Sequence, residues 1–315
     1  MLHFLHKQWF LIAIAGASLL AYFCPEWGDT LKKYGFFSVG IFLAFFITGL
    51  CLETRSILRQ IQEIRAPIAA AVSSLFLYPL LAWLMALPVL PYEFVIGVCI
   101  IGVGPVTVSS GTIMTAIARG NVPLSLFICI LTSFLAIFTI PLMLNMLLSV
   151  GGKVDLPVIK MLGGLFIKVL VPIILGQIIR PFIRKFIQQI NHPLSVFQSW
   201  VIILIIFRAV SSSADNIGQA GTAIISIIAF MVFLHFFMLF VNYGIAHLLK
   251  LDRPSITAFT IHTSQKTLTV TYIVWAGYFA NDYPMAFIPA IICQLTQMTA
   301  GTFVAEFFRK RASVN

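Results

Sequence analysis

Apolar runs of about 20 residues follow one another along the whole chain, each ended by a charged residue or by Gly, Pro or Asn. A helix of that length crosses the hydrocarbon core of a bilayer, where only helices and closed barrels satisfy their backbone hydrogen bonds. Soluble domains carry about a quarter charged residues, whereas 10% of this chain is charged. The short alternating segments of an outer-membrane barrel are not found in the sequence. We therefore predict an all-α membrane protein.

The apolar runs predict ten transmembrane helices, five in each half of the chain. Those of the first half are expected at 8–24, 35–52, 67–89, 94–118 and 122–148, and those of the second at 156–179, 195–212, 220–248, 255–279 and 284–307. The first run resembles a signal peptide, but because further spans follow it we interpret it as an uncleaved first helix.

Basic residues fall mainly on one side of this predicted topology. With the N-terminus in the cytoplasm, the cytoplasmic segments hold Lys7, Arg55, Arg59, Arg65, Arg119, Arg180, Arg184, Lys185, Lys250, Arg253, Arg309, Lys310 and Arg311. The opposite side holds Lys32, Lys33 and Lys153 beside Glu26, Asp29, Glu93, Asp155, Asp215 and Asp282. Because cytoplasmic loops are enriched in Lys and Arg, both termini are predicted to be cytoplasmic. The net charge of +10 is thus interpreted as a topology signal, and no nucleic-acid partner is expected.

Two pairs of motifs relate residues 1–150 to residues 151–315. VSSGTIM (108–114) aligns with TSQKTLT (263–269), and CILTSFLA (129–136) aligns with CQLTQMTA (293–300), in the same order. Because each half has an odd number of spans, the second copy would enter the membrane in the opposite orientation. Such inverted repeats are typical of secondary transporters, whose sites form where discontinuous helices of the two halves meet near the bilayer midplane.

Polar clusters interrupt the fourth and ninth spans. The fourth carries GVGPVTVSSGT (102–112), where Gly104-Pro105 removes a backbone donor and disfavours helix, and the ninth carries TIHTSQKTLTV (260–270). Ser and Thr in membrane helices often serve only packing, but two aligned clusters, one with a lysine, favour a binding site. The candidate residues are Thr107, Ser109, Ser110, Thr112, His262, Ser264, Gln265, Lys266 and Thr267, with the helix break at Gly104 and Pro105.

At GPVTVSSGTIMTAIARGNVPLS (104–125) and HTSQKTLTV (262–270) the sequence resembles the bile acid:sodium symporter family, solute carrier family 10. It is most similar to the branch of orphan members found in bacteria and eukaryotes, so a bacterial inner membrane is the expected location. The resemblance implies a panel domain of spans 1, 2, 6 and 7 and a core domain of spans 3–5 and 8–10. It also implies that discontinuous spans 4 and 9 cross in the core, and that solute binds between panel and core during alternating access.

The sequence departs from the sodium-coupled members of that family at their ion ligands. A glutamine and a serine of the family pattern match Gln265 and Ser125, whereas other ligand positions fall on Ser74, Gly111, Thr112, Cys129 and, in place of a glutamate, Ile261. Sodium needs several oxygen ligands and usually a carboxylate. Because no Asp or Glu lies inside a predicted span core, sodium coupling and a metal site are not expected.

Lys266 is a functional candidate because a charged group at membrane depth is costly unless it is paired or hydrated. Its ammonium could replace the missing sodium ion, attract an anionic substrate together with helix N-termini, or lose its proton during the transport cycle. A fourth interpretation is that the side chain only extends to the membrane interface. The first interpretation is favoured, and the first three are compatible with one another.

The predicted function is secondary active transport of a small organic anion without sodium coupling, with the bilayer and in one interpretation protons as further partners. A cation/proton exchanger that uses Lys266 and a regulatory membrane protein without transport are the alternatives. An intramembrane enzyme is disfavoured because Ser109 or Ser110 beside His262 would lack an orienting acid. No cofactor is expected.

Overall fold

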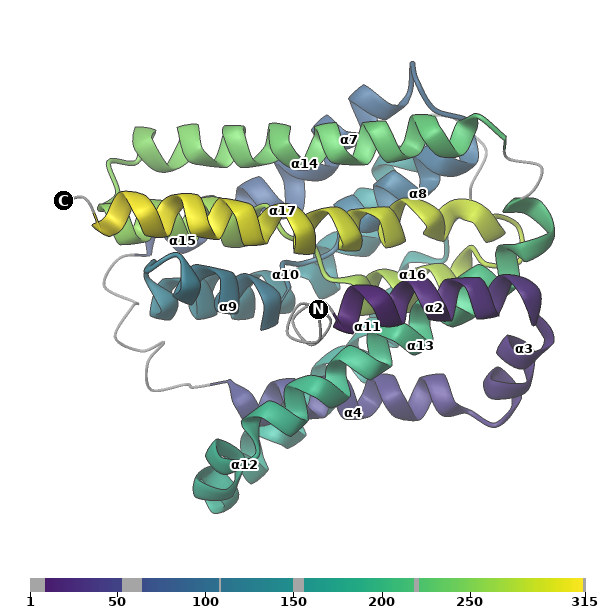
Figure 1. Cartoon of the computed structure of the whole chain (residues 1–315), viewed down its shortest axis with the longest axis horizontal. Coiled ribbons are helices and arrows are strands. Elements are labelled where there is room, and N and C mark those ends of the chain that lie inside the picture. Colours follow the sequence, from purple (N-terminus) through teal and green to yellow (C-terminus); the bar gives the residue numbers. More distant parts are fainter. Residues whose placement is uncertain (1–8, 53–63, 108, 150–155, 218–220, 314–315) are drawn as a thin grey trace.

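The structure is a computed structural model and describes residues 9–52, 64–107, 109–149, 156–217 and 221–313 (Figure 1). Every regular element in these ranges is a helix. Six of the helical segments are long and apolar enough to cross a membrane. A seventh is obtained if α3 (Glu26–Lys33) and α4 (Phe36–Cys51), which meet at an angle of 67°, count as one span.

The remaining elements follow in chain order. The first half contains α2 (Trp9–Phe23), α6 (Arg65–Val72), the π-helix η2 (Ser73–Leu77), α7 (Tyr78–Ala86), α8 (Tyr92–Gly102), α9 (Ser109–Ile117) and α10 (Val122–Ser149). The second half contains α11 (Val158–Leu165), the π-helix η3 (Phe166–Leu170), α12 (Val171–Gln189), α13 (Asn191–Ile217), α14 (Ala223–Leu248), α15 (Arg253–Thr263), α16 (Leu268–Tyr278), the 3₁₀-helix η4 (Pro284–Phe287) and α17 (Ile288–Ser313).

Helix length identifies fewer membrane spans than the apolar runs predicted. The run at 94–118 is divided between α8 and α9, and the run at 255–279 between α15 and α16. The run at 8–24 forms α2, which has 15 residues. The arrangement of ten spans therefore stays a prediction, whereas the all-helical class agrees with the structure.

Local chemistry explains where the first divided segment breaks and where the second begins. Pro105 has no backbone N–H to donate, and a Cβ on Gly104 would lie 3.2 Å from the carbonyl oxygen of Ile101. In the second divided segment, α15 begins after the N-cap residue Asp252, whose side chain accepts a hydrogen bond of 3.3 Å from the Ser255 N–H. In Figure 1, α9 and α15 lie toward the end that holds the C-terminus, and α8 and α16 lie toward the other.

Helices α4 and α12 pack unusually closely because glycines face each other's backbone. A Cβ on Gly49 would overlap the carbonyl oxygen of Ile173, and a Cβ on Gly176 would overlap that of Phe46. The Gln177 amide donates hydrogen bonds to the carbonyl oxygens of Gly49 and Leu52 across the same contact, the second at 2.9 Å. Small residues that let backbones approach are typical of helix pairs in membranes, where lipid removes most of the hydrophobic driving force.

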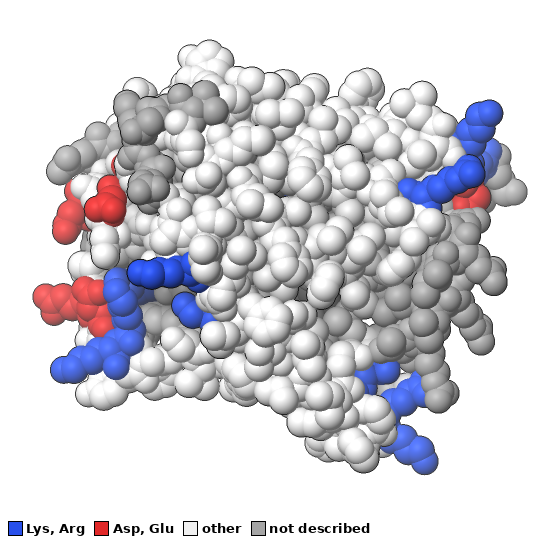
Figure 2. Space-filling model, turned by 180° about the vertical axis from the view of Figure 1, so that it is seen from behind, with Lys and Arg blue, Asp and Glu red and all other residues white. Residues whose placement is uncertain are grey.

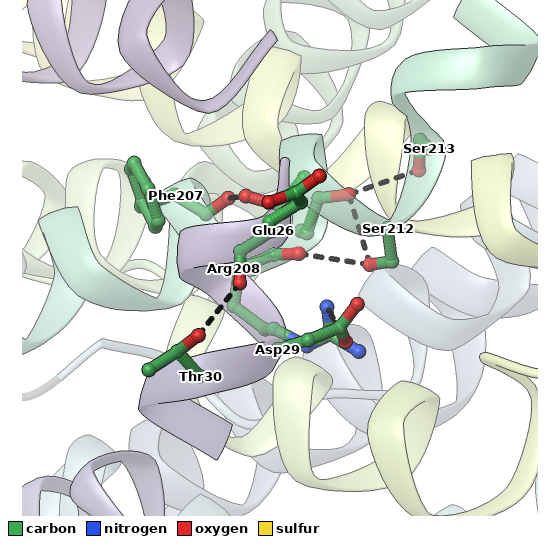
Figure 3. A network of polar contacts seen from close by, with 9 residues as sticks. Glu26, Asp29, Thr30, Phe207, Arg208, Ser212 and Ser213 are labelled. Carbon is green, nitrogen blue, oxygen red and sulfur yellow. Dashed lines mark hydrogen bonds and ion pairs between the residues drawn. The ribbon is translucent and has the colours of Figure 1, made fainter. Parts of the chain in front are cut away.

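Charged side chains gather toward the two ends of the long axis on the face seen in Figure 2, and the surface between them is uncharged. At the end opposite the C-terminus, α3 is held to α13 by an ion pair of 2.9 Å between Asp29 and Arg208 (Figure 3). The Ser212 hydroxyl donates to the Arg208 carbonyl oxygen at 2.8 Å. Lys7, Arg55, Arg59, Lys153 and Asp155, which entered the topology prediction, lie outside the described residues.

Candidate functional site

The two helix breaks lie against each other. The Thr267 N–H donates to the Pro105 carbonyl oxygen at 3.0 Å, which joins the segment between α15 and α16 to the segment between α8 and α9. Both segments are almost fully buried, so their unwound backbone is enclosed by protein. Irregular backbone at membrane depth is tolerated only in such surroundings.

The Lys266 side chain is 0% exposed, and oxygen atoms surround its ammonium. Nζ donates to the carbonyl oxygen of Ser74 at 2.5 Å, to the hydroxyl of Ser74 at 2.9 Å and to the carbonyl oxygen of Gly104 at 2.9 Å. It also lies 4.4 Å from the centre of the Tyr78 ring, within the range of a cation–π interaction. Each of the three ammonium protons thus has an oxygen acceptor within the protein.

The carbonyl oxygen of Ser74 is available because the helix around it is not α-helical. Ser74 lies in η2, where the Tyr78 N–H donates to the Ser73 carbonyl oxygen five residues back. In that register the donor for Ser74 would be residue 79, which is a proline without an N–H. The combination of a π-helix and Pro79 therefore leaves one buried carbonyl oxygen free to accept from Lys266.

Gln297 of α17 holds the Lys266 backbone in place, and Gln294 of the same helix holds the Gln297 side chain. Gln297 accepts from the Lys266 N–H and donates to the Lys266 carbonyl oxygen, both at 2.8 Å, and it also donates to Gln294 Oε1 at 2.7 Å. A single amide side chain thus replaces both hydrogen bonds that the residue would make in a helix. The position of the lysine is fixed through its main chain as well as through its ammonium.

His262 forms a second polar cluster beside the lysine. Its Nε2 lies 2.8 Å from the Thr107 carbonyl oxygen, which can only accept, so Nε2 carries a proton. Its Nδ1 contacts the hydroxyl of Ser125, which in turn lies 3.5 Å from the hydroxyl of Thr112. The ring packs on Gly111, where a Cβ would come within 3.0 Å of it.

The other candidate residues divide between the crossing and its surroundings. The Ser110 hydroxyl lies 2.9 Å from Gln265 Oε1, and this contact also joins the two breaks. Ser264 faces α14 and its own helix, since its hydroxyl accepts from Asn242 on α14 and donates to the Thr260 carbonyl oxygen, both at 2.8 Å. Ser109 begins α9, and its side chain is not described.

The structure adds partners that the motifs did not single out as site residues. They are Ser73, Ser74, Tyr78, Asn242, Gln294 and Gln297. Pro79, a proline within an apolar run, could have indicated a backbone carbonyl oxygen without a helical donor. The two glutamines lie in the CQLTQ segment, which the comparison of the two halves had aligned with CILTS. A lone Asn242 in a membrane helix gave no indication of its partner.

The site is cationic and rich in oxygen acceptors. Ile261 is buried in the turn before His262, and among the described residues no carboxylate forms an ion pair with Lys266. No group of three His, Cys, Asp or Glu side chains that could hold a metal ion is found in the described ranges. The arrangement can stabilise one buried positive charge without any negative partner.

Two interrupted helices that meet around a buried charge inside an apolar helical protein are typical of membrane transporters. Residues 8–310 match the SBF-like CPA transporter family, and the chain belongs to that family, which is part of the bile acid:sodium symporter group. The family is made up of transporters rather than enzymes. The chain is therefore an integral membrane protein that handles a small-molecule substrate.

Three relatives span most of the chain. "Probable sodium/metabolite cotransporter BASS4, chloroplastic" of Oryza sativa subsp. japonica is 26% identical over 98% of this chain and 77% of its own length. "Sodium/bile acid cotransporter 7" of Xenopus tropicalis is 26% identical over 95% and 90%, respectively. "Uncharacterized sodium-dependent transporter YocS" of Bacillus subtilis is 26% identical over 96% and 92%.

Proposed function

We propose that this protein is a secondary active transporter of a small organic anion that works by alternating access without sodium coupling. In this proposal the Lys266 ammonium permanently occupies the place of a sodium ion at the helix crossing. The observation that carries the proposal is the oxygen shell of Nζ, formed by Ser74 and Gly104 at 2.5–2.9 Å. Backbone carbonyl and hydroxyl oxygens are the ligands that a hard cation such as sodium would take.

The proposed architecture has ten spans in two inverted repeats, 1–150 and 151–315. In it, α2–α4 and α11–α13 form the panel, and α6–α10 and α14–α17 form the core. The contacts between the two breaks support this pairing, since Lys266 meets Gly104 and Thr267 meets Pro105. A cavity of about 100 Å³ between α4, α10 and η3–α12, lined in part by Thr48, Cys129 and Ser133, lies where panel and core would separate.

An anionic substrate is supported by the sign of the charges at the crossing. Helices α9 and α16 both begin at the helix crossing, at Ser109 and Leu268. Their positive N-terminal ends therefore lie next to a buried lysine. Two relatives are named for bile acid and for metabolite transport, which supports an organic solute. In the observed conformation the ammonium is fully occupied by protein oxygens, so we assign it a structural rather than a direct substrate-binding role.

Uptake into proteoliposomes tests the function. The purified protein is supplied with a library of radiolabelled organic anions, with and without sodium and proton gradients imposed across the membrane. We expect uptake of at least one anion that is unchanged when choline replaces sodium. Uptake driven by a sodium gradient would contradict the proposal, and ion flux without any organic substrate would favour a cation/proton exchanger instead.

A variant comparison tests the part assigned to the lysine. Lys266→Ala is expected to lose uptake, whereas Lys185→Ala, which removes an exposed lysine of α12 outside the predicted span at 156–179, is expected to keep it. Normal uptake by Lys266→Ala would exclude the proposed part. A well-folded wild-type protein that moves no solute in any gradient would instead indicate a regulatory protein without transport.

A further inference from the structure

A second cavity, of about 430 Å³, lies at the end of the molecule that carries the last turn of α17. It is bounded by the C-terminal ends of α9, α14 and α17 and by the first turns of α15. None of its lining residues belongs to α2–α4 or α11–α13, and none belongs to the helix crossing around Lys266. It is therefore a site apart from the one to which transport was assigned above.

Three arginines line this cavity, and the guanidinium of one of them, Arg311, lies 4.9 Å from the centre of the Phe307 ring. Arg119 follows α9, Arg253 begins α15 and Arg311 lies in the last turns of α17, and no acidic residue is among the lining side chains. Two carboxylates on neighbouring turns are engaged elsewhere: Asp252 caps α15, and Glu306 pairs with Arg309 at 2.7 Å. A preference for basic residues on one side of the membrane explains their presence at this end, but not the convergence of three on one cavity.

Aromatic side chains also line the cavity. The Tyr243 ring lies 4.1 Å from the His247 ring and 6.3 Å from the Phe308 ring, measured between ring centres. Arg253 is the first residue of α15, so the positive end of that helix dipole adds to the field of the arginines. The volume falls in the usual range for small-molecule sites, which combine apolar walls with a few placed polar groups.

We propose that this cavity binds a phosphate monoester, with the phosphate held by Arg119 and Arg253 and the attached organic group against Tyr243 and Phe308. Guanidinium is planar and pairs with two phosphate oxygens at once, so two arginines in a cavity that no acidic side chain lines favour a phosphate over a cation. The ligand is either a soluble phosphate ester or the monoester headgroup of a membrane lipid. The inference does not depend on the proposed transport function.

Thermal unfolding of the full chain tests the site and separates the two sources. Phenyl phosphate is titrated into protein in nanodiscs of phosphatidylcholine at constant ionic strength, with phenol as the uncharged control. In the second arm, nanodiscs that contain phosphatidic acid are compared with pure phosphatidylcholine. We expect a saturable rise in melting temperature with phenyl phosphate and none with phenol if the source is soluble, or a rise with phosphatidic acid alone if the source is a lipid.

Variants decide whether the effect belongs to this cavity. Arg119→Gln and Arg253→Gln are expected to weaken phosphate binding by about tenfold or more, as for a lost charge-assisted pair. Arg65→Gln removes the same charge from an exposed position at the start of α6, outside the cavity, and is expected to have no effect. An equal loss in all three variants, or no response to either probe in the wild type, would overturn the proposal.

Discussion

Lys266 differs from the other described Lys and Arg residues in being fully buried. The sequence singled it out because a charge inside an apolar run is expensive, and this reasoning needed no knowledge of the fold. Both acceptor residues had been named, Gly104 at the helix break and Ser74 at a ligand position of the family pattern, but their contact with the ammonium was not predictable, because they lie about 160 and 190 positions away in the chain. One of them is a backbone carbonyl that is free only because η2 is a π-helix and residue 79 is a proline.

Replacing the lysine gives a specific prediction about ions. Lys266→Ala leaves two carbonyl oxygens and one hydroxyl without their donor in a buried site, and each such group costs about 1–3 kcal/mol. We expect a clear loss of thermal stability in detergent, with a partial recovery when sodium chloride replaces choline chloride, because sodium can enter the vacated oxygen shell. The wild type is expected to show no difference between the two salts.

The matched control is Lys185→Ala, since this lysine is exposed on α12 and lies outside the predicted span at 156–179. Its removal should change the free energy of unfolding by less than about 0.5 kcal/mol, and its response to sodium should equal that of the wild type. If Lys266→Ala were as stable as the wild type, or if choline restored it as well as sodium, the ammonium would not be acting as a substitute for the ion.

At the scale of single elements, the two breaks could be predicted from the sequence, whereas the bend between α3 and α4 and the two π-helices were not predicted. Gly104-Pro105 indicated where α8 ends, because Pro105 cannot donate a backbone hydrogen bond and disfavours helix in the residue before it. The end of α15 was expected only from the alignment of TSQKTLT with VSSGTIM. The bend of 67° between α3 and α4 turns on Gly35, which has a φ of 74°. The two π-helices were not predicted, although a proline stands two residues after each of them, Pro79 after η2 and Pro172 after η3.

The contact between α4 and α12 makes a testable prediction at this scale. Gly49→Ala and Gly176→Ala each place a methyl group where a backbone carbonyl oxygen of the partner helix already lies, so the helices must separate. We expect each substitution to lower the free energy of unfolding by about 1–3 kcal/mol, as for overpacking of a core. Melting temperature in detergent measures the effect.

Two other helical glycines provide the control. A Cβ on Gly163 of α11 or on Gly244 of α14 would meet no atom within 4 Å. Alanine favours helix over glycine by about 1 kcal/mol, so Gly163→Ala and Gly244→Ala should leave stability unchanged or raise it. Equal destabilisation by all four substitutions would mean that close packing of α4 against α12 is not the cause.

At the scale of the whole molecule, composition and apolar runs were sufficient for the all-helical membrane class. The family was recognised from the motifs at 104–125 and 262–270, which contain residues of the two breaks. The number of spans was harder to obtain, since a broken helix and a continuous one have the same hydropathy. The cavity beside Arg119 was not predictable either, because its three arginines come from distant parts of the chain.

Cysteine labelling tests the orientation that is proposed from the charged ends. The proposal of cytoplasmic termini places Lys185, at the end of α12, inside the cell and Asp282, which follows α16, outside. In a background with Cys24→Ser and Cys51→Ser, which removes the partly exposed thiols, we expect an impermeant maleimide to label Asp282→Cys on intact cells. Lys185→Cys should be labelled only after the cells are permeabilised. The reverse pattern would invert the topology, and labelling of both residues on intact cells would place the two ends on the same side and contradict the span arrangement.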